Sequence, residues 1–333
     1  MRLGYLAAAL GGIVLILLIA WFGSRTIGIE VLHAGWAIPA NTIVHLFQLF
    51  LSACAWRLAV GDRSLSRRSF FRLRVIREGV NSLLPAAQIG GQLVAVRLMM
   101  KAGIRGAVAG AGTTLDITLE AAMQLVFTLA GIGVLAGFDT NHSWASWVGG
   151  GLITGAIGIV GFVVAQRAGL LRVIEWLALN LQRVWPALSV DSLRGLHREL
   201  MKLQRDWRTL ARASAWHFIS WSLGTAEVYL TMLALGVPVG MAAAFVIESL
   251  GMAARSAGFV VPGALGVQEG GFILACGLFG VPPEAAIALS MVKRLREILV
   301  GLPGLALWHW AELNRDRASE RNGGMRNFPQ RSQ

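Results

Sequence analysis

The chain has 333 residues, of which 55% are hydrophobic and 14% are charged, whereas a soluble globular domain carries about 25% charged residues. This composition excludes an ordinary soluble domain and indicates a membrane protein. The net charge of +12 is compatible with a nucleic-acid partner, but the cations stand in short blocks between apolar segments, as in the cytoplasmic loops of membrane proteins. We therefore expect no nucleic-acid partner.

The first apolar segment, residues 4–22, contains no charged residue and is long enough to cross about 30 Å of hydrocarbon. Large residues follow it where a signal peptidase would need small ones, so we predict a retained span. Further segments of spanning length are residues 38–60, 106–136, 145–165, 213–236 and 284–311.

The charges between these segments predict their direction. Residues 61–78 carry six arginines, and residues 166–212 carry nine lysines or arginines against four acids. The connections on the other side carry one cation between them. By the positive-inside rule, both termini of this multi-pass membrane protein are predicted to lie in the cytoplasm.

Two apolar regions, residues 79–103 and 241–280, cannot each cross once, because the basic connections would then lie on opposite sides. Both contain helix-breaking stretches, NSLLPAAQIGGQ and VVPGALGVQEGG. We predict that each region enters the membrane and returns as a re-entrant hairpin. Lipid tolerates such irregular backbone only where protein or a water-filled cavity surrounds it, so both hairpins should line the interior.

The two halves of the chain, residues 1–136 and 145–312, are predicted to be repeats. An offset of 177 residues relates Pro85 to Pro262, Gly103 to Gly280, and Glu120 to Glu297. Each half has an odd number of crossings, so the second half is inverted relative to the first. We predict an all-α polytopic membrane protein with about six transmembrane helices and two re-entrant hairpins in an inverted repeat. A duplicated helical scaffold without a transport role is the alternative.

Charged residues inside two predicted spans indicate a polar interior. Asp116 and Glu120 lie near the middle of one span, and Lys293, Arg294, Arg296 and Glu297 lie inside the last. Facing lipid, each would cost about 2.5–3.5 kcal/mol. Our hypothesis is that Asp116 and Glu120 approach Lys293 and Arg294, while Lys293 and Glu297 can pair along their helix. The alternative is that KRLRE forms a loop between two shorter segments.

Other polar residues have two interpretations each. Arg97 and Arg255 lie in the hairpin regions and either contact an anionic head group or extend to the membrane surface. Glu269 is either a polar group of the cavity or a cap on a helix N-terminus. The six histidines are scattered without ligand spacing, and both cysteines lie in apolar segments. We therefore expect no metal site, no disulfide, no cofactor and no catalytic residue.

The connection over residues 166–212 contains two amphipathic helical stripes, one of which includes Leu196, Leu200 and Leu203. These helices are predicted to lie on the anionic inner-leaflet surface, or alternatively to pack against each other. The tail, residues 313–333, is basic and is predicted to be disordered in the cytoplasm.

Three stretches carry a resemblance to a known family: EGVNSLLPAAQIGGQLVAVRLMMKAG, TTLDITLEAAMQL, and VPGALGVQEGGFILACGLFGVPPEAAIALSMVKRLREILVGLPG. Over residues 1–312 the chain resembles the lysylphosphatidylglycerol-synthase transmembrane family of flippase-like proteins. Within it, the LLPAAQIGGQ and DITLE forms look most like the hopanoid-biosynthesis-associated membrane proteins of Gram-negative bacteria. The resemblance implies a lipid translocase-like domain in a bacterial inner membrane, with hopanoid or another polar lipid, such as a phospholipid, as cargo.

The resemblance also implies which residues surround the lipid head group. It points to Pro85, Gly90, Gly91, Arg97, Asp116, Glu120, Pro262, Gly263, Gly266, Glu269 and Arg294, and Lys293 and Glu297 join them from the charge pattern. The sequence departs from the family at Ala264, where a second glycine is common, and at Gln92, where an acid is common. No soluble aminoacyl-transfer domain follows the last span, so lysyl transfer is not expected.

A second hypothesis is a non-transporting membrane subunit that holds lipid-biosynthetic enzymes through residues 166–212. An intramembrane enzyme is disfavoured, because no nucleophile, metal-ligand set or acid pair has a recognisable spacing.

Overall fold

The computed structural model describes residues 34–84, 90–138, 190–258, 261 and 264–325. The predicted spans at residues 4–22 and 145–165 lie outside these ranges, as does the connection up to residue 189. Within the described ranges every regular element is a helix, which confirms the all-helical class. The elements are η1 (Ala34–Trp36), α3 (Ala37–Val60), α4 (Arg67–Leu83), α5 (Gly90–Lys101), α6 (Gly106–Ala136), α9 (Val190–Leu203), α10 (Trp207–Ala234), α11 (Met241–Ala257), α12 (Val267–Gly277) and α13 (Pro283–Met325).

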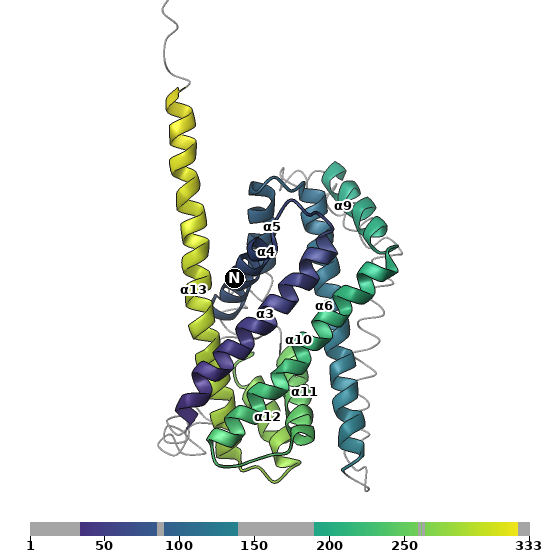
Figure 1. Cartoon of the computed structure of the whole chain (residues 1–333), viewed down its shortest axis with the longest axis vertical. Helices are drawn as coiled ribbons and strands as arrows, with labels where there is room; N and C mark the ends of the chain where they lie inside the picture. Colours follow the sequence, from purple (N-terminus) through teal and green to yellow (C-terminus); the bar gives the residue numbers. More distant parts are fainter. Residues whose placement is uncertain (1–33, 85–89, 139–189, 259–260, 262–263, 326–333) are drawn as a thin grey trace, which may run out of the picture.

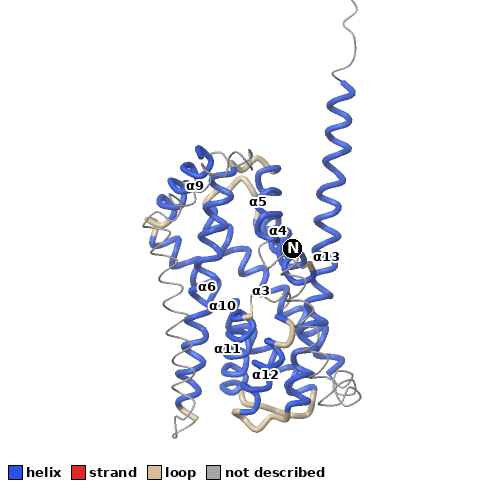
Figure 2. Tube along the Cα trace, turned by 180° about the vertical axis from the view of Figure 1, so that it is seen from behind, coloured by secondary structure: helices blue, strands red, loops and turns tan. Residues whose placement is uncertain are grey.

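The helices form an elongated bundle. Figure 1 shows α3 and α10 crossing it obliquely in contact with each other, while α6 and α13 follow its long axis. The helices α4 and α5 contact each other in one half of the bundle, and α11 and α12 contact each other in the other half. Figure 2 shows the same separation from behind. The second half of α13 extends beyond the bundle and continues into the basic tail.

Four helices fall on predicted spans: α3, α6, α10 and α13. Two described segments, Ala34–Val60 and Gly106–Ala136, are long and apolar enough to cross a membrane. The helices α10 and α13 have the necessary length, 28 and 43 residues, but carry charged residues inside, so their crossing stays a prediction. Because α13 is one continuous helix through residues 293–297, the loop alternative for KRLRE is wrong.

The helix α4 begins at Arg67, twelve residues before the start of the predicted hairpin region at residue 79. Ser66 is its N-cap, and the Ser66 hydroxyl accepts a hydrogen bond from the Ser69 amide at 3.1 Å. The charge pattern predicts that Arg74 and Arg77 are loop cations, but their side chains lie in α4 and these residues are only 8% and 4% exposed. That interpretation is wrong for these two residues, because α6 supplies acidic partners that make their burial possible.

Small residues allow α4 and α13 to approach closely. A Cβ atom added at Gly304 would lie 2.4 Å from the Val75 backbone oxygen, and one at Gly79 would lie 2.5 Å from the Gly301 oxygen. Any larger side chain at either position would separate the two helices. Close backbone approach through glycine is typical of helix contacts in membranes, where van der Waals packing replaces the hydrophobic effect.

The helix α9 packs against α6. Leu200 is fully buried and contacts Ala111 and Leu115 of α6, with Leu196 and Leu203 packed beside it. This part of the predicted amphipathic stripe therefore packs against α6. Contact of the remaining connection with the inner leaflet stays a prediction.

Candidate functional site

A cavity of about 290 Å³ lies inside the bundle. It is lined by side chains of α3, α4, α5, α6, α10, α11 and α13, and the helices α4 and α11 contribute their C-terminal halves. Its charged lining residues are Arg74, Arg77, Glu78, Glu120, Glu248, Arg255, Lys293, Arg296 and Glu297. Such a concentration of charge inside an apolar bundle marks a functional site by default.

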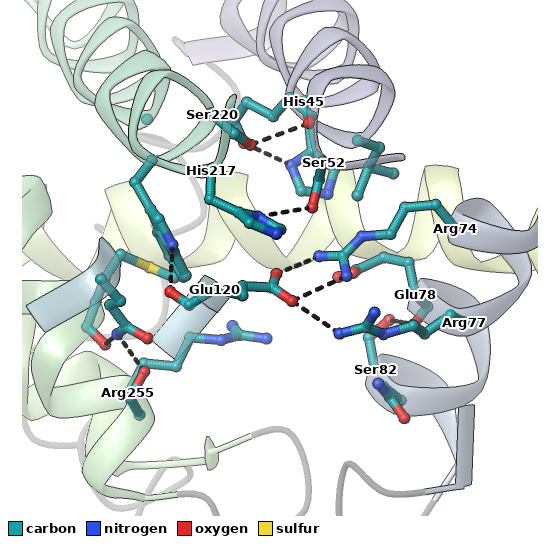
Figure 3. A pocket seen from close by; sticks show the side chains of 18 of the residues that line it. His45, Ser52, Arg74, Arg77, Glu78, Ser82, Glu120, His217, Ser220 and Arg255 are labelled. Carbon is teal, nitrogen blue, oxygen red and sulfur yellow. Dashed lines mark hydrogen bonds and ion pairs between the residues drawn. The ribbon is translucent and has the colours of Figure 1, made fainter. Parts of the chain in front are cut away.

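The first ion cluster joins α4 to α6 and comprises Arg74, Arg77, Asp116 and Glu120. Arg74 donates to both carboxylate oxygens of Glu120, at 3.1 and 2.5 Å. Arg77 donates to Asp116 Oδ2 at 2.6 Å and to Glu120 Oε2 at 2.7 Å. Figure 3 shows Glu120 between the two guanidinium groups. Two-point contacts of this kind fix the orientation of the carboxylate as well as its charge.

His217 extends this first cluster from α10. Its Nε2 atom lies 3.0 Å from Asp116 Oδ1, and its Nδ1 atom lies 3.4 Å from the Ser52 hydroxyl. The Trp221 indole donates to the backbone oxygen of Glu120 at 3.2 Å. A helix of the second half of the chain therefore contacts both acids of α6.

The second ion cluster joins α10 and α11 to α13 and comprises Glu227, Glu248, Lys293 and Arg296. The Lys293 ammonium donates to Glu227 at 2.8 Å and to Glu248 at 3.1 Å. Arg296 donates to Glu227 at 2.8 Å, and its Nη1 atom lies 2.6 Å from His45 Nδ1. Through His45, the helix α3 of the first half of the chain therefore contacts a charged residue of the second half.

Arg255 of α11 and Glu297 of α13 form a further pair beside the cavity, with 2.6 Å between Arg255 Nη1 and Glu297 Oε1. The pair resembles Arg77 and Glu120 in its place along the chain, because each arginine lies on the helix before a proline- and glycine-containing stretch and each glutamate lies on the next long helix. Arg296 Nη2 also lies 3.5 Å from Glu297. Arg255 therefore contacts a carboxylate of the cavity wall.

Glu269 lies at the start of α12 and is completely buried. Its Oε2 atom accepts from the Gly266 amide at 2.7 Å, while its Oε1 atom accepts from Arg294 at 2.6 Å and from Ser290 at 2.9 Å. Gly266 has φ +79°, a conformation that costs glycine little and other residues more. Glu269 thus caps α12, and it is not among the residues that line the cavity.

The hypothesis that Asp116 and Glu120 pair with Lys293 and Arg294 is wrong. The acids of α6 are neutralised by α4, Lys293 is neutralised by Glu227 and Glu248, and Arg294 binds Glu269. Glu120 and Lys293 nevertheless line the same cavity.

The remaining predicted residues occupy different places. The Arg97 side chain is 65% exposed and lies 3.7 Å from Glu312, away from the cavity. Gly90 and Gly91 begin α5, where the Gly91 amide donates to Asn81 Oδ1 at 2.9 Å. Pro85, Pro262 and Gly263 lie outside the described residues.

Six residues of the two ion clusters carry no signal that placed them in the predicted site: His45, Arg74, Arg77, His217, Glu227 and Glu248. The one exception is the spacing of Arg74 and Arg77, which are three residues apart and so share a helix face. Within the described residues, no group of three or more His, Cys, Asp or Glu side chains is placed to hold a metal ion.

The fold and the cavity define a helical domain with paired charges enclosed in an apolar bundle. The family model described as "Lysylphosphatidylglycerol synthase TM region" matches residues 6–304. The chain belongs to this family of membrane domains, which confirms the resemblance found in its motifs. Its similarity to a "UPF0104 membrane protein" of Methanothermobacter thermautotrophicus is 24% identity over 273 residues, covering 74% of this chain and 77% of the relative. No solved structure matches the chain.

Proposed function

We propose that the protein is a lipid translocase of a bacterial inner membrane, with hopanoid or another polar lipid as cargo and both termini in the cytoplasm. The observation that supports this most directly is the charged cavity, with a volume of about 290 Å³. A water molecule occupies about 30 Å³ in the liquid, so the space suits a head group and not a whole lipid. The apolar part of the cargo would remain in the bilayer.

The proposed cavity offers hydrogen-bonding atoms to a head group. Five buried side-chain atoms of its lining residues form no hydrogen bond with any described residue: His45 Nε2, Arg74 Nε, Arg77 Nε, Gln92 Oε1 and Glu248 Oε2. The last of these lies in an ion pair with Lys293. Buried polar atoms in proteins nearly always have a partner. This mixture of donor and acceptor atoms on the lining residues favours a ligand that both accepts and donates hydrogen bonds, such as a phosphate or a polyol.

The arrangement of the helices supports an inverted repeat. The pair α4 and α5 lies in the opposite half of the bundle from the pair α11 and α12 (Figure 1). The C-terminal halves of α4 and α11 both reach the cavity. In secondary transporters with inverted repeats, broken helices meet at a central site in the same way. We propose that these two pairs are the re-entrant hairpins.

Lipid distribution in a deletion strain tests the proposal. Hopanoids and phospholipids are quantified in the inner and outer membranes of the strain complemented with wild type or Ala121→Phe. Ala121 lines the cavity, and a phenylalanine there fills the space while it leaves every ion pair intact. We expect this variant to be present in the membrane and to fail to restore the distribution.

The control is Ala136→Phe, at the exposed end of α6, which we expect to restore the distribution fully. Glu120→Gln provides a second test that changes the charge of the cavity rather than its volume. A normal distribution in the deletion strain, or full complementation by Ala121→Phe, would reject the translocase proposal. The scaffold for lipid-biosynthetic enzymes would then be the better account.

A further inference from the structure

A second cavity lies between α4, α5 and α13, apart from the charged cavity. Its volume is about 620 Å³, and its lining includes Leu73, Ile76, Leu98, Leu307 and Trp310. The lining residues of α4 are three or four positions apart and so share one side of that helix. In the same way, Leu307 and Trp310 share one side of α13. The result is an apolar groove wide enough for hydrocarbon.

Two cations stand beside the apolar wall of this groove, Arg72 of α4 and Lys101 at the end of α5. Arg72 is exposed and forms no ion pair with any residue that the structure describes. Lys101 contacts Glu312, but an ammonium group has three N–H donors, so it can bind a second anion. The groove therefore combines an apolar wall with available positive charge.

A ligand that fits both features has a hydrocarbon chain and an anionic group. Trp310 adds an indole ring beside the cations, and tryptophan and arginine together are typical of the level of lipid head groups. Inorganic phosphate has no part that would occupy Leu73, Ile76 or Leu307. A zwitterionic lipid would leave the charge of Arg72 without a net counter-charge.

We propose that this groove is a binding site for one anionic phospholipid, with an acyl chain along Leu73 and Leu307 and the phosphate at Arg72 and Lys101. Such a lipid would be retained by the protein rather than exchanged freely with the bilayer. The proposal does not depend on translocation, because the groove shares no lining residue with the charged cavity.

Fluorescence quenching tests the site. The full chain is purified in a zwitterionic or uncharged detergent, and phosphatidylglycerol or phosphatidylcholine with brominated acyl chains is added. The contribution of Trp310 is the difference between wild type and Trp310→Phe. We expect brominated phosphatidylglycerol to quench this contribution at a lower mole fraction than brominated phosphatidylcholine.

The variant Arg72→Gln should raise the half-quenching mole fraction of phosphatidylglycerol about fivefold, since one cation near a charged lipid contributes about that factor. The quenching curve of Arg72→Gln with phosphatidylglycerol should approach the curve with phosphatidylcholine. The matched control is Arg198→Gln on α9, also exposed, which should leave both curves unchanged. Equal quenching by the two lipids in wild type, or an unchanged preference in Arg72→Gln, would overturn the proposal. Elution in size-exclusion chromatography shows that each variant is folded.

Discussion

At the scale of single residues, each charged side chain that is buried in the described part of the chain lies beside an opposite charge. Asp116, Glu227 and Glu269 are completely buried, and each contacts at least one arginine or lysine. A buried pair is not by itself a large source of stability, because desolvation offsets the attraction. The loss of one partner is costly, however, because the remaining charge is then buried without compensation.

Asp116→Asn should therefore destabilise the protein. Arg77 would lose the carboxylate at 2.6 Å but keep Glu120 at 2.7 Å, so we expect a loss of about 3 kcal/mol, the lower end for a broken buried pair. The measurement is the free energy of unfolding in detergent.

The control for Asp116→Asn is Asp62→Asn, in the exposed connection between α3 and α4, which should change stability little. The double variant Arg77→Gln/Asp116→Asn should lose less than the sum of the two single variants, because the two residues contact each other. Strictly additive losses would show that the pair is not coupled.

At the scale of elements, the contact between α4 and α13 depends on the absence of side chains. Gly304→Ala would place a Cβ atom 2.4 Å from the Val75 backbone oxygen, and we expect it to destabilise the protein by about 1–3 kcal/mol, as overpacking does. Gly133→Ala on α6 meets nothing within 4 Å and should be neutral or stabilising, because alanine favours helix more than glycine. Thermal unfolding in detergent compares the two; equal effects would contradict the close contact.

The start of α10 depends on a titratable cap. Asp206 accepts from the Thr209 hydroxyl at 2.7 Å and from the Thr209 amide at 3.1 Å. These hydrogen bonds hold the pKa of Asp206 below its ordinary value. A lowered pKa in the folded state means that the cap stabilises α10 at neutral pH and loses this effect as the pH falls through that pKa.

Hydrogen exchange of the first turn of α10 measures this effect. We expect protection of the amides of residues 208–210 to fall on acidification more steeply in wild type than in Asp206→Asn, because asparagine caps a helix without titrating. Asp206→Ala should show low protection at every pH. The same acid dependence in wild type and Asp206→Asn would assign the titration to another group.

At the scale of the whole molecule, the predicted topology can be checked from outside the membrane. Arg63 lies in the connection between α3 and α4, and Pro238 lies in the connection between α10 and α11. Both are exposed. In a background with Cys54→Ala and Cys276→Ala, a membrane-impermeant maleimide added to spheroplasts should label Pro238→Cys, and it should label Arg63→Cys only after the membrane is opened.

Apolar segments predicted α3, α6, α10 and α13 because length and periodicity are local properties of a sequence. The partners of Asp116 and Lys293 could not be predicted in the same way. They depend on which helices become neighbours, and the arginine-rich block before residue 79 looks like a cytoplasmic loop by composition. Arg74 and Arg77 satisfy the charge pattern of a loop while they form part of a buried network.

The sequence separation of these pairs affects how the protein is synthesised. When the acids of α6 leave the ribosome, Arg74 and Arg77 have already been made, 46 and 39 residues earlier than their partners Glu120 and Asp116. For Glu227 of α10 the order of synthesis is reversed, because its partner Lys293 follows it by 66 residues. On the predicted topology, Glu227 and Glu248 therefore enter the membrane before any cation of α13 exists. The ion pairs of the second cluster can therefore form only after α13 has been made. A nascent chain that stops before α13 would leave Glu227 and Glu248 without their cation and would expose them to the quality-control proteases of the membrane.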